Sequence, residues 1–81
     1  MIIKIENIYG DRWLFSAYDD ASHHYIKVYA IKDADVGAYS VILGEGKSYP
    51  SKNRGLVAKF STHEGQHSKS EIVTFLVDAL G

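Results

Sequence analysis

Apolar and polar residues alternate along the first part of the chain, and this alternation predicts β-strands. In the first such segment Ile3 and Ile5 fall on one face, whereas Lys4 and Glu6 fall on the other. A period of two residues is typical of a strand that buries one face and exposes the other. Three segments show this pattern and are predicted to be strands: residues 2–9, 12–18 and 25–31.

The middle of the chain is less regular. Residues 38–43 are predicted to be a strand, because Tyr39, Val41 and Ile42 are residue types that favour strands. A helix over residues 34–43 is the alternative that the sequence leaves open.

A long loop and one more strand are predicted after it. Residues 44–55 contain glycine, serine and proline and no apolar period, so we expect a loop there. Alternation returns in residues 56–61, where Leu56, Ala58 and Phe60 share one face. This segment is predicted to be the fifth strand.

The last element is predicted to be a helix with a defined start. Ser68 and Glu71 have the spacing of a capping box, in which each side chain bonds to the backbone N–H of the other residue. The apolar residues that follow recur at helical spacing and form one stripe. These residues are Ile72, Phe75, Leu76, Ala79 and Leu80.

The order of the predicted elements is β-β-β-β-β-α, which indicates an α+β fold. We expect an antiparallel sheet of about four or five strands, with the C-terminal helix packed on one face. A chain of 81 residues with 46% hydrophobic residues and one proline is typical of an ordered globule. Residues 1–81 are therefore predicted to be a single small globular domain.

Charge and hydropathy say more about where the protein is located in the cell than about what it binds. A net charge of −1 leaves protein and nucleic-acid partners open. The apolar run at residues 1–6 is interrupted by Lys4 and Glu6, which a signal peptide would not contain. Since the chain also has no apolar stretch of membrane-spanning length, we expect a cytoplasmic protein with no membrane partner.

One segment has the sequence pattern of a zinc site. His63, Glu64 and His67 follow the pattern H-E-x-x-H, in which two histidines on one helical face bind zinc and the glutamate acts as general base. The predicted helix begins only at Ser68, so residues 63–66 are expected in a loop and His67 just before the helix. We therefore predict no cofactor and no enzyme activity. A metal-dependent enzyme using His63 and His67 remains the third hypothesis.

Aromatic residues on the third strand suggest a binding surface. If Ile26, Val28 and Ala30 face the helix, the residues that alternate with them face the other way, on a side of the sheet that no second helix covers. Exposed tyrosines suit protein interfaces, where this residue type is enriched. The residues predicted to bind a protein are Tyr18, Tyr25, Lys27, Tyr29 and, from the long loop, Tyr49.

A second surface is basic. Between residues 46 and 60 the chain has four cations and no acidic residue. Such a hairpin could follow the phosphates of a nucleic acid. The residues predicted for this alternative function are Lys47, Lys52, Arg54 and Lys59.

Taken together, the sequence predicts a small non-catalytic binding protein, an adaptor or inhibitor that docks on a larger protein through the tyrosines, the basic hairpin or both. A nucleic-acid-binding module is the alternative. An exposed edge strand would also permit a homodimer.

Overall fold

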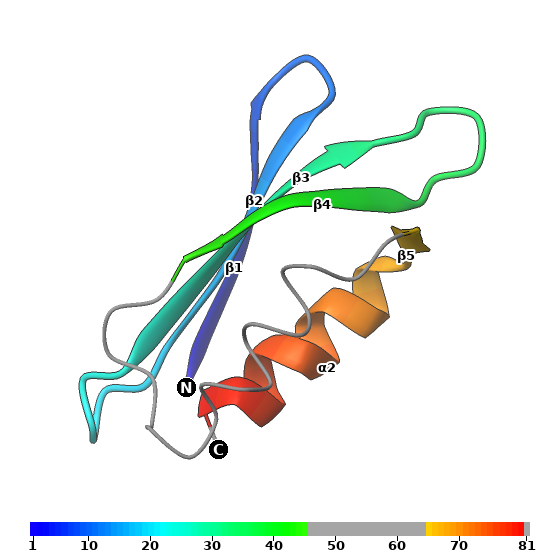
Figure 1. The fold of residues 1–81 in the computed structure, drawn as a ribbon. Helices are drawn as coiled ribbons and strands as arrows, with labels where there is room; N and C mark the ends of the chain where they lie inside the picture. The colour runs from blue at the N-terminus through cyan, green and yellow to red at the C-terminus, as the bar shows by residue number, and fades with distance from the viewer. Residues whose placement is uncertain (46–64, 81) are drawn as a thin grey trace.

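The computed structural model describes residues 1–45 and 65–80, which form five strands and one helix (Figure 1). The fold is α+β, as the sequence predicts. The elements follow one another in the order β1 (Ile2–Tyr9), β2 (Arg12–Tyr18), β3 (Tyr25–Lys32), β4 (Tyr39–Glu45), β5 (Gln66–His67) and α2 (Lys69–Leu80).

All neighbouring strands are antiparallel, and their spatial order is the chain order, β1-β2-β3-β4-β5. The connections from β1 to β4 are short, as antiparallel neighbours allow. The first turn is closed by Asn7, whose Nδ2 donates to the carbonyl oxygens of Gly10 and Arg12, each at 3.1 Å. A register shift between Asn7 and Tyr9 accompanies this turn, so that Tyr9 lies opposite Arg12.

The middle of the chain is a strand, and the alternative helix over residues 34–43 is wrong. Residues 33–38 instead form a turn, in which the Gly37 N–H donates to the Asp33 carbonyl at 2.7 Å. Strand β4 runs to Glu45, so the predicted loop cannot begin at residue 44. The predicted strand over residues 56–61 lies outside the described residues.

The fifth strand in the described structure is one that the sequence did not predict. Gln66 and His67, expected in a loop and just before the helix, pair instead with Ser40 and Tyr39 of β4. Two residues are too few to show an alternating pattern, so this strand could not be recognised from periodicity.

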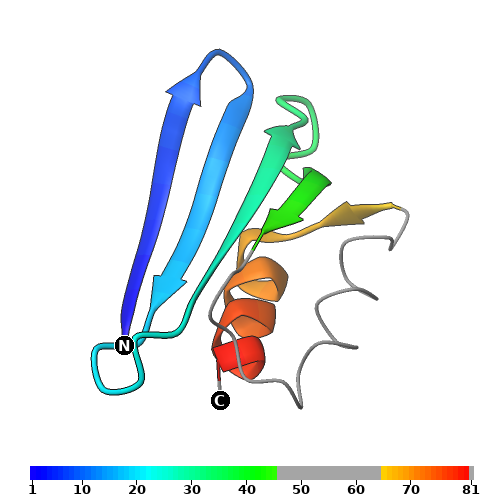
Figure 2. The same cartoon turned by 60° about the vertical axis from the view of Figure 1, so that its left-hand side comes forward.

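The helix covers one face of the sheet, and no other element of the described residues covers the opposite face (Figure 2). Helix α2 packs on β2 and β3, and its five predicted apolar residues are all buried. They meet the buried side chains of the strands, which confirms the predicted inner face of β3. The buried hydrophobic residues from the strands are Phe15, Ala17, Ile26, Val28, Ala30 and Tyr39.

Tyr39 joins the strands within this core. Its side chain is only 5% exposed, and its ring meets Phe15 edge-on with the centroids 4.9 Å apart. Trp13 makes a second edge-on contact with Tyr39 at 6.0 Å. Edge-to-face ring pairs contribute more than the burial of their surface alone.

Candidate protein-binding face

The face of the sheet opposite α2 carries three of the four predicted tyrosines, Tyr18, Tyr25 and Tyr29. Residues Tyr25, Lys27 and Tyr29 alternate along β3 with the buried residues of the inner face, and all three are partly exposed. Tyr18 of β2 is 37% exposed and lies opposite Tyr25, and Leu14 lies opposite Tyr29. We call the outer face of β1, β2 and β3 the tyrosine face.

A depression of about 390 Å³ lies on the tyrosine face. Tyr18 and Tyr25 contribute aromatic rings to its lining, and Ile2, which is 46% exposed, contributes an apolar side chain. Binding sites commonly combine such apolar walls with a few polar groups. The complete lining is Ile2, Lys4, Ser16, Ala17, Tyr18, Tyr25, Ile26 and Lys27.

The polar part of this depression is a row of three residues across three strands. Ser16 of β2 lies directly opposite Lys4 of β1 and directly opposite Lys27 of β3. Side chains at directly opposite positions have Cβ atoms roughly 5 Å apart, so both ammonium groups can reach an anion held over Ser16. The neighbouring acidic positions are Glu6, one row further along β1, and Glu45, opposite Lys27 on β4.

Tyr18 is held in place by the β2–β3 connection. Its hydroxyl lies 2.9 Å from His23 Nδ1, and the backbone of His23 has a positive φ of 61°. The connection is ordered by Asp19, which accepts hydrogen bonds from the Ser22 hydroxyl (3.0 Å) and the Ala21 N–H (3.1 Å). These two bonds, the one from Ser22 foremost, lower the pKa of the Asp19 carboxyl.

Another cationic residue lies on the inner face, beside the core. The Lys32 Nζ lies 5.5 Å from the centre of the Trp13 ring and 5.9 Å from that of Tyr39. A depression of about 430 Å³ adjoins this cation–π contact, with Asp11 in its wall. Lys32 is therefore engaged with aromatic rings of its own chain in the structure.

The H-E-x-x-H segment has no helical geometry where it is described. His67 is a β5 residue, only 5% exposed, and its Nδ1 lies 3.2 Å from Oε2 of Glu71. Ser68 and Glu71 form the predicted capping box: the Ser68 hydroxyl accepts the Glu71 N–H at 3.1 Å, and the Ser68 N–H donates to Glu71 Oε1 at 3.5 Å. His63 and Glu64 lie outside the described residues.

Glu71 responds to these contacts electrostatically. The contact with His67 and the N–H of Ser68 stabilise its carboxylate, and the pKa of Glu71 is lowered, with the His67 contact as the larger cause. Glu71 therefore both caps the helix and contacts the strand that precedes it.

Gln66 links the same segment to the β3–β4 turn. Its Nε2 donates to Asp33 Oδ2 at 3.0 Å, while Asp33 Oδ1 accepts the N–H of Asp35 at 2.9 Å. The two bonds lower the pKa of the Asp33 carboxyl, and the bond from Gln66 has the larger effect. In the structure, Gln66 and His67 thus connect β4, the turn and α2.

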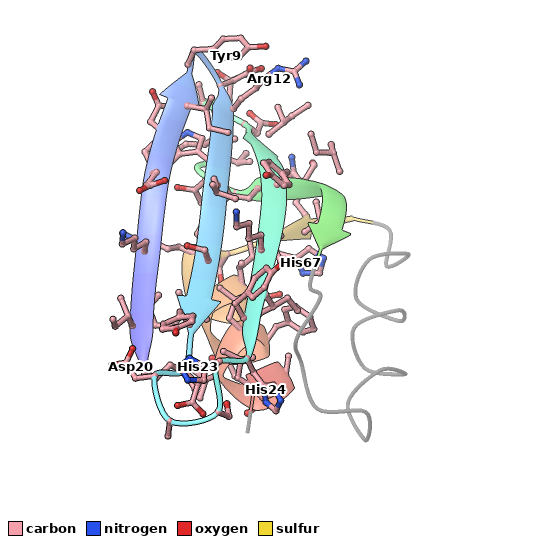
Figure 3. All side chains as sticks on the ribbon, turned by 90° about the vertical axis from the view of Figure 1, so that its left-hand side faces the viewer. Tyr9, Arg12, Asp20, His23, His24 and His67 are labelled. Carbon is pink, nitrogen blue, oxygen red and sulfur yellow. The ribbon has the colours of Figure 1, made fainter. Side chains whose placement is uncertain are left out.

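The three histidines that the structure describes do not converge on one point. His23 and His24 lie at the β2–β3 connection, and His67 lies apart from them on β5 (Figure 3). Across residues 1–45 and 65–80, no three histidine, aspartate or glutamate side chains gather as metal ligands would. The predicted basic residues and Tyr49 lie outside the part of the chain that the structure describes.

Sequence reasoning missed Ile2, Lys4 and Ser16 as parts of the tyrosine face. Alternation places all three on one side of their strands, but only the register brings Lys4 and Ser16 beside Lys27.

In the described residues, no helix is both long and apolar enough to cross a membrane.

Comparison of this chain with protein-family models, with curated proteins and with solved structures gives no match. A functional proposal therefore rests on the chemistry and geometry of the surface alone.

Proposed function

We propose that this chain is a small non-catalytic binding protein, of the adaptor or inhibitor type, that docks on a larger protein through the tyrosine face. The observation that carries the proposal is the depression on this face, where Tyr18 and Tyr25 lie next to Lys4 and Lys27. Tyrosine is enriched among the residues that contribute most of the binding energy in protein interfaces.

The tyrosines suit this role for a physical reason. Each presents a large, stiff ring with a polar tip, so it buries much area on binding while losing little side-chain entropy. Tyr18 and Tyr25 lie on adjacent strands that are held in register by a regular antiparallel ladder. Such a surface is organised before the partner arrives, which reduces the cost of binding.

The cations suggest what the partner presents. Lys4 and Lys27 flank Ser16, and the acidic positions nearest to them are Glu6, one row away on β1, and Glu45, opposite Lys27 on β4. A carboxylate of the partner can meet both ammonium groups and the Ser16 hydroxyl, with an apolar neighbour against Ile2 and Tyr18. The partner segment that fits is therefore acidic and partly apolar.

Affinity purification with matched variants tests the proposal. The tagged chain is expressed in its native cell, and co-purified proteins are quantified by mass spectrometry. Tyr25→Thr/Tyr29→Thr keeps residues that favour strands and removes the rings. The wild type should retain a protein that this double variant loses by about tenfold or more, as expected when interface aromatic residues are removed.

Two controls make the result specific. Val77→Ser changes an exposed position on α2, where Val77 is 42% exposed, and should capture the same protein as the wild type. Nuclease treatment of the extract separates the alternative function, because material that disappears with nuclease is bound through nucleic acid. Equal capture by wild type and the double tyrosine variant would contradict the proposal.

A further inference from the structure

We infer that the outer edge of β1 is a dimerisation surface, on which a second copy of this chain pairs its own β1 in an antiparallel register centred on Ile5. Among the strands that the structure describes, β1 is the first in the order of the sheet, is eight residues long, and lies at the edge in Figures 1 and 2. The outer edge of such a strand offers backbone N–H and C=O groups to another strand. This inference does not depend on the proposed function.

The charges of β1 are complementary to themselves in this register. A two-fold axis at Ile5 places Lys4 of one protomer opposite Glu6 of the partner subunit, and the axis repeats the pair. Lys4 and Glu6 both lie on the tyrosine face and are both exposed. Opposite charges at directly opposite positions stabilise an antiparallel pair, whereas like charges destabilise it.

The neighbouring symmetric registers lack this complementarity. In an antiparallel pair, residues directly opposite each other have their side chains on the same face of the sheet. A two-fold axis between two copies of β1 must therefore pass beside a residue, and the alternative registers place it at one residue after another. A centre at Lys4 opposes two lysines, and a centre at Glu6 opposes two glutamates. Only the centre at Ile5 among these three gives opposite charges at both positions.

The inner side of β1 also favours a partner. Helix α2 packs on β2 and β3, and Ile3 and Ile5 at the margin of the core are only partly buried. In the inferred register the two Ile5 side chains meet at the axis, with both helices on the same side of a ten-strand sheet. The segment of β1 from Ile3 to Asn7, which would pair with the same segment of the partner subunit, has a regular register with β2, because the register shift falls after Asn7.

Charge exchange on β1 tests the register without removing the fold. Sedimentation of the wild type should give a dimer of about twice the 9.0 kDa of one chain. Lys4→Glu and Glu6→Lys each oppose like charges and should raise the dimer dissociation constant about tenfold or more. The double variant Lys4→Glu/Glu6→Lys restores both pairs and should dimerise within about threefold of the wild type.

Cysteine cross-linking provides the second measurement, since the chain has no cysteine of its own. Ile5→Cys places two thiols opposite each other at the axis, within the range of a disulfide. Ile3→Cys places them roughly 14 Å apart along the strands. Oxidation should join Ile5→Cys chains and not Ile3→Cys chains. A wild type that is monomeric at millimolar concentration, equal cross-linking by both variants, or a double charge variant that stays dissociated would overturn the inference.

Discussion

His67 Nδ1 lies 3.2 Å from Glu71 Oε2, and this contact joins the last strand to the first turn of α2. The two residues are four apart in the chain, as in a helical pair, but His67 belongs to β5 and only Glu71 belongs to α2. The contact fixes how the chain enters the helix. The second histidine of the H-E-x-x-H pattern is therefore a buried part of the junction between β5 and α2.

The cap at this junction should contribute measurably to stability. Ser68→Ala removes the acceptor for the Glu71 N–H and should lower the free energy of unfolding by about 1 kcal/mol. Ser68→Asp keeps an acceptor at the helix N-terminus and should stay close to the wild type. Urea unfolding of the three proteins measures both differences. Equal stability of the alanine and aspartate variants would contradict the capping role.

Acid should weaken the fold through carboxylates that accept hydrogen bonds. The pKa of Asp33 is lowered in the folded state, first by the bond from Gln66, so the unfolded chain binds its proton more readily. This contribution is fully present above the ordinary aspartate pKa of about 4 and is lost as the pH falls through the lowered value. The lowered pKa values of Asp19 and Glu71 act in the same direction.

Two variants separate the Asp33 contribution from the others. Asp33→Asn removes the titrating group, and Gln66→Ala removes the donor that lowers its pKa. Unfolding free energies measured between about pH 5 and pH 2 should therefore fall less steeply in both variants than in the wild type. If the unfolding free energies of both variants fell with pH as steeply as that of the wild type, the Asp33–Gln66 bond would make no contribution to the pH dependence of stability.

The aromatic contact in the core should appear as a coupling energy. Tyr39 and Phe15 meet edge-on at 4.9 Å, and both side chains are buried. A double-mutant cycle with Tyr39→Leu and Phe15→Leu should give a coupling of about 0.5–1.5 kcal/mol. The cycle is measured by chemical denaturation. Additive losses would mean that the rings contribute only their buried surface.

The β3–β4 turn should depend on backbone conformation rather than on space. Gly37 has a φ of +69°, and nothing lies within 4 Å of the position that a Cβ would occupy. Gly37→Ala should therefore lower stability by about 1 kcal/mol through the backbone alone. Gly37→Asn should lower it less, because asparagine tolerates this conformation. An alanine variant more stable than the asparagine variant in thermal unfolding would refute this reasoning.

The long strands could be predicted because alternation extends over seven or eight residues. The predicted bounds 2–9 and 12–18 agree with the structure, and β3 extends one residue beyond 25–31, to Lys32. The helix could be predicted from its cap and its apolar stripe. Strand β5 could not, since a two-residue strand is determined by its pairing with β4 rather than by its own pattern.

The tyrosine face was only half predictable for a related reason. The alternation of side chains along β3 places Tyr25, Lys27 and Tyr29 on one face, and the structure agrees with that placement. The row that adds Lys4 depends on the register of β1 with β2. Counting back from Tyr9 opposite Arg12 would pair Lys4 with the wrong neighbour, because the register shifts by one residue at the turn.

Site-specific photo-cross-linking is the most direct test of the tyrosine face as a protein-binding surface. A photoreactive phenylalanine derivative replaces Tyr29 on the tyrosine face or, as the control, Val77 on the exposed side of α2. The Tyr29 position should form an adduct with a larger protein, and excess wild-type chain should suppress it. Excess Tyr25→Thr/Tyr29→Thr should not. An adduct formed equally at both positions, or one that the wild type fails to suppress, would contradict the assignment of the tyrosine face as a protein-binding surface.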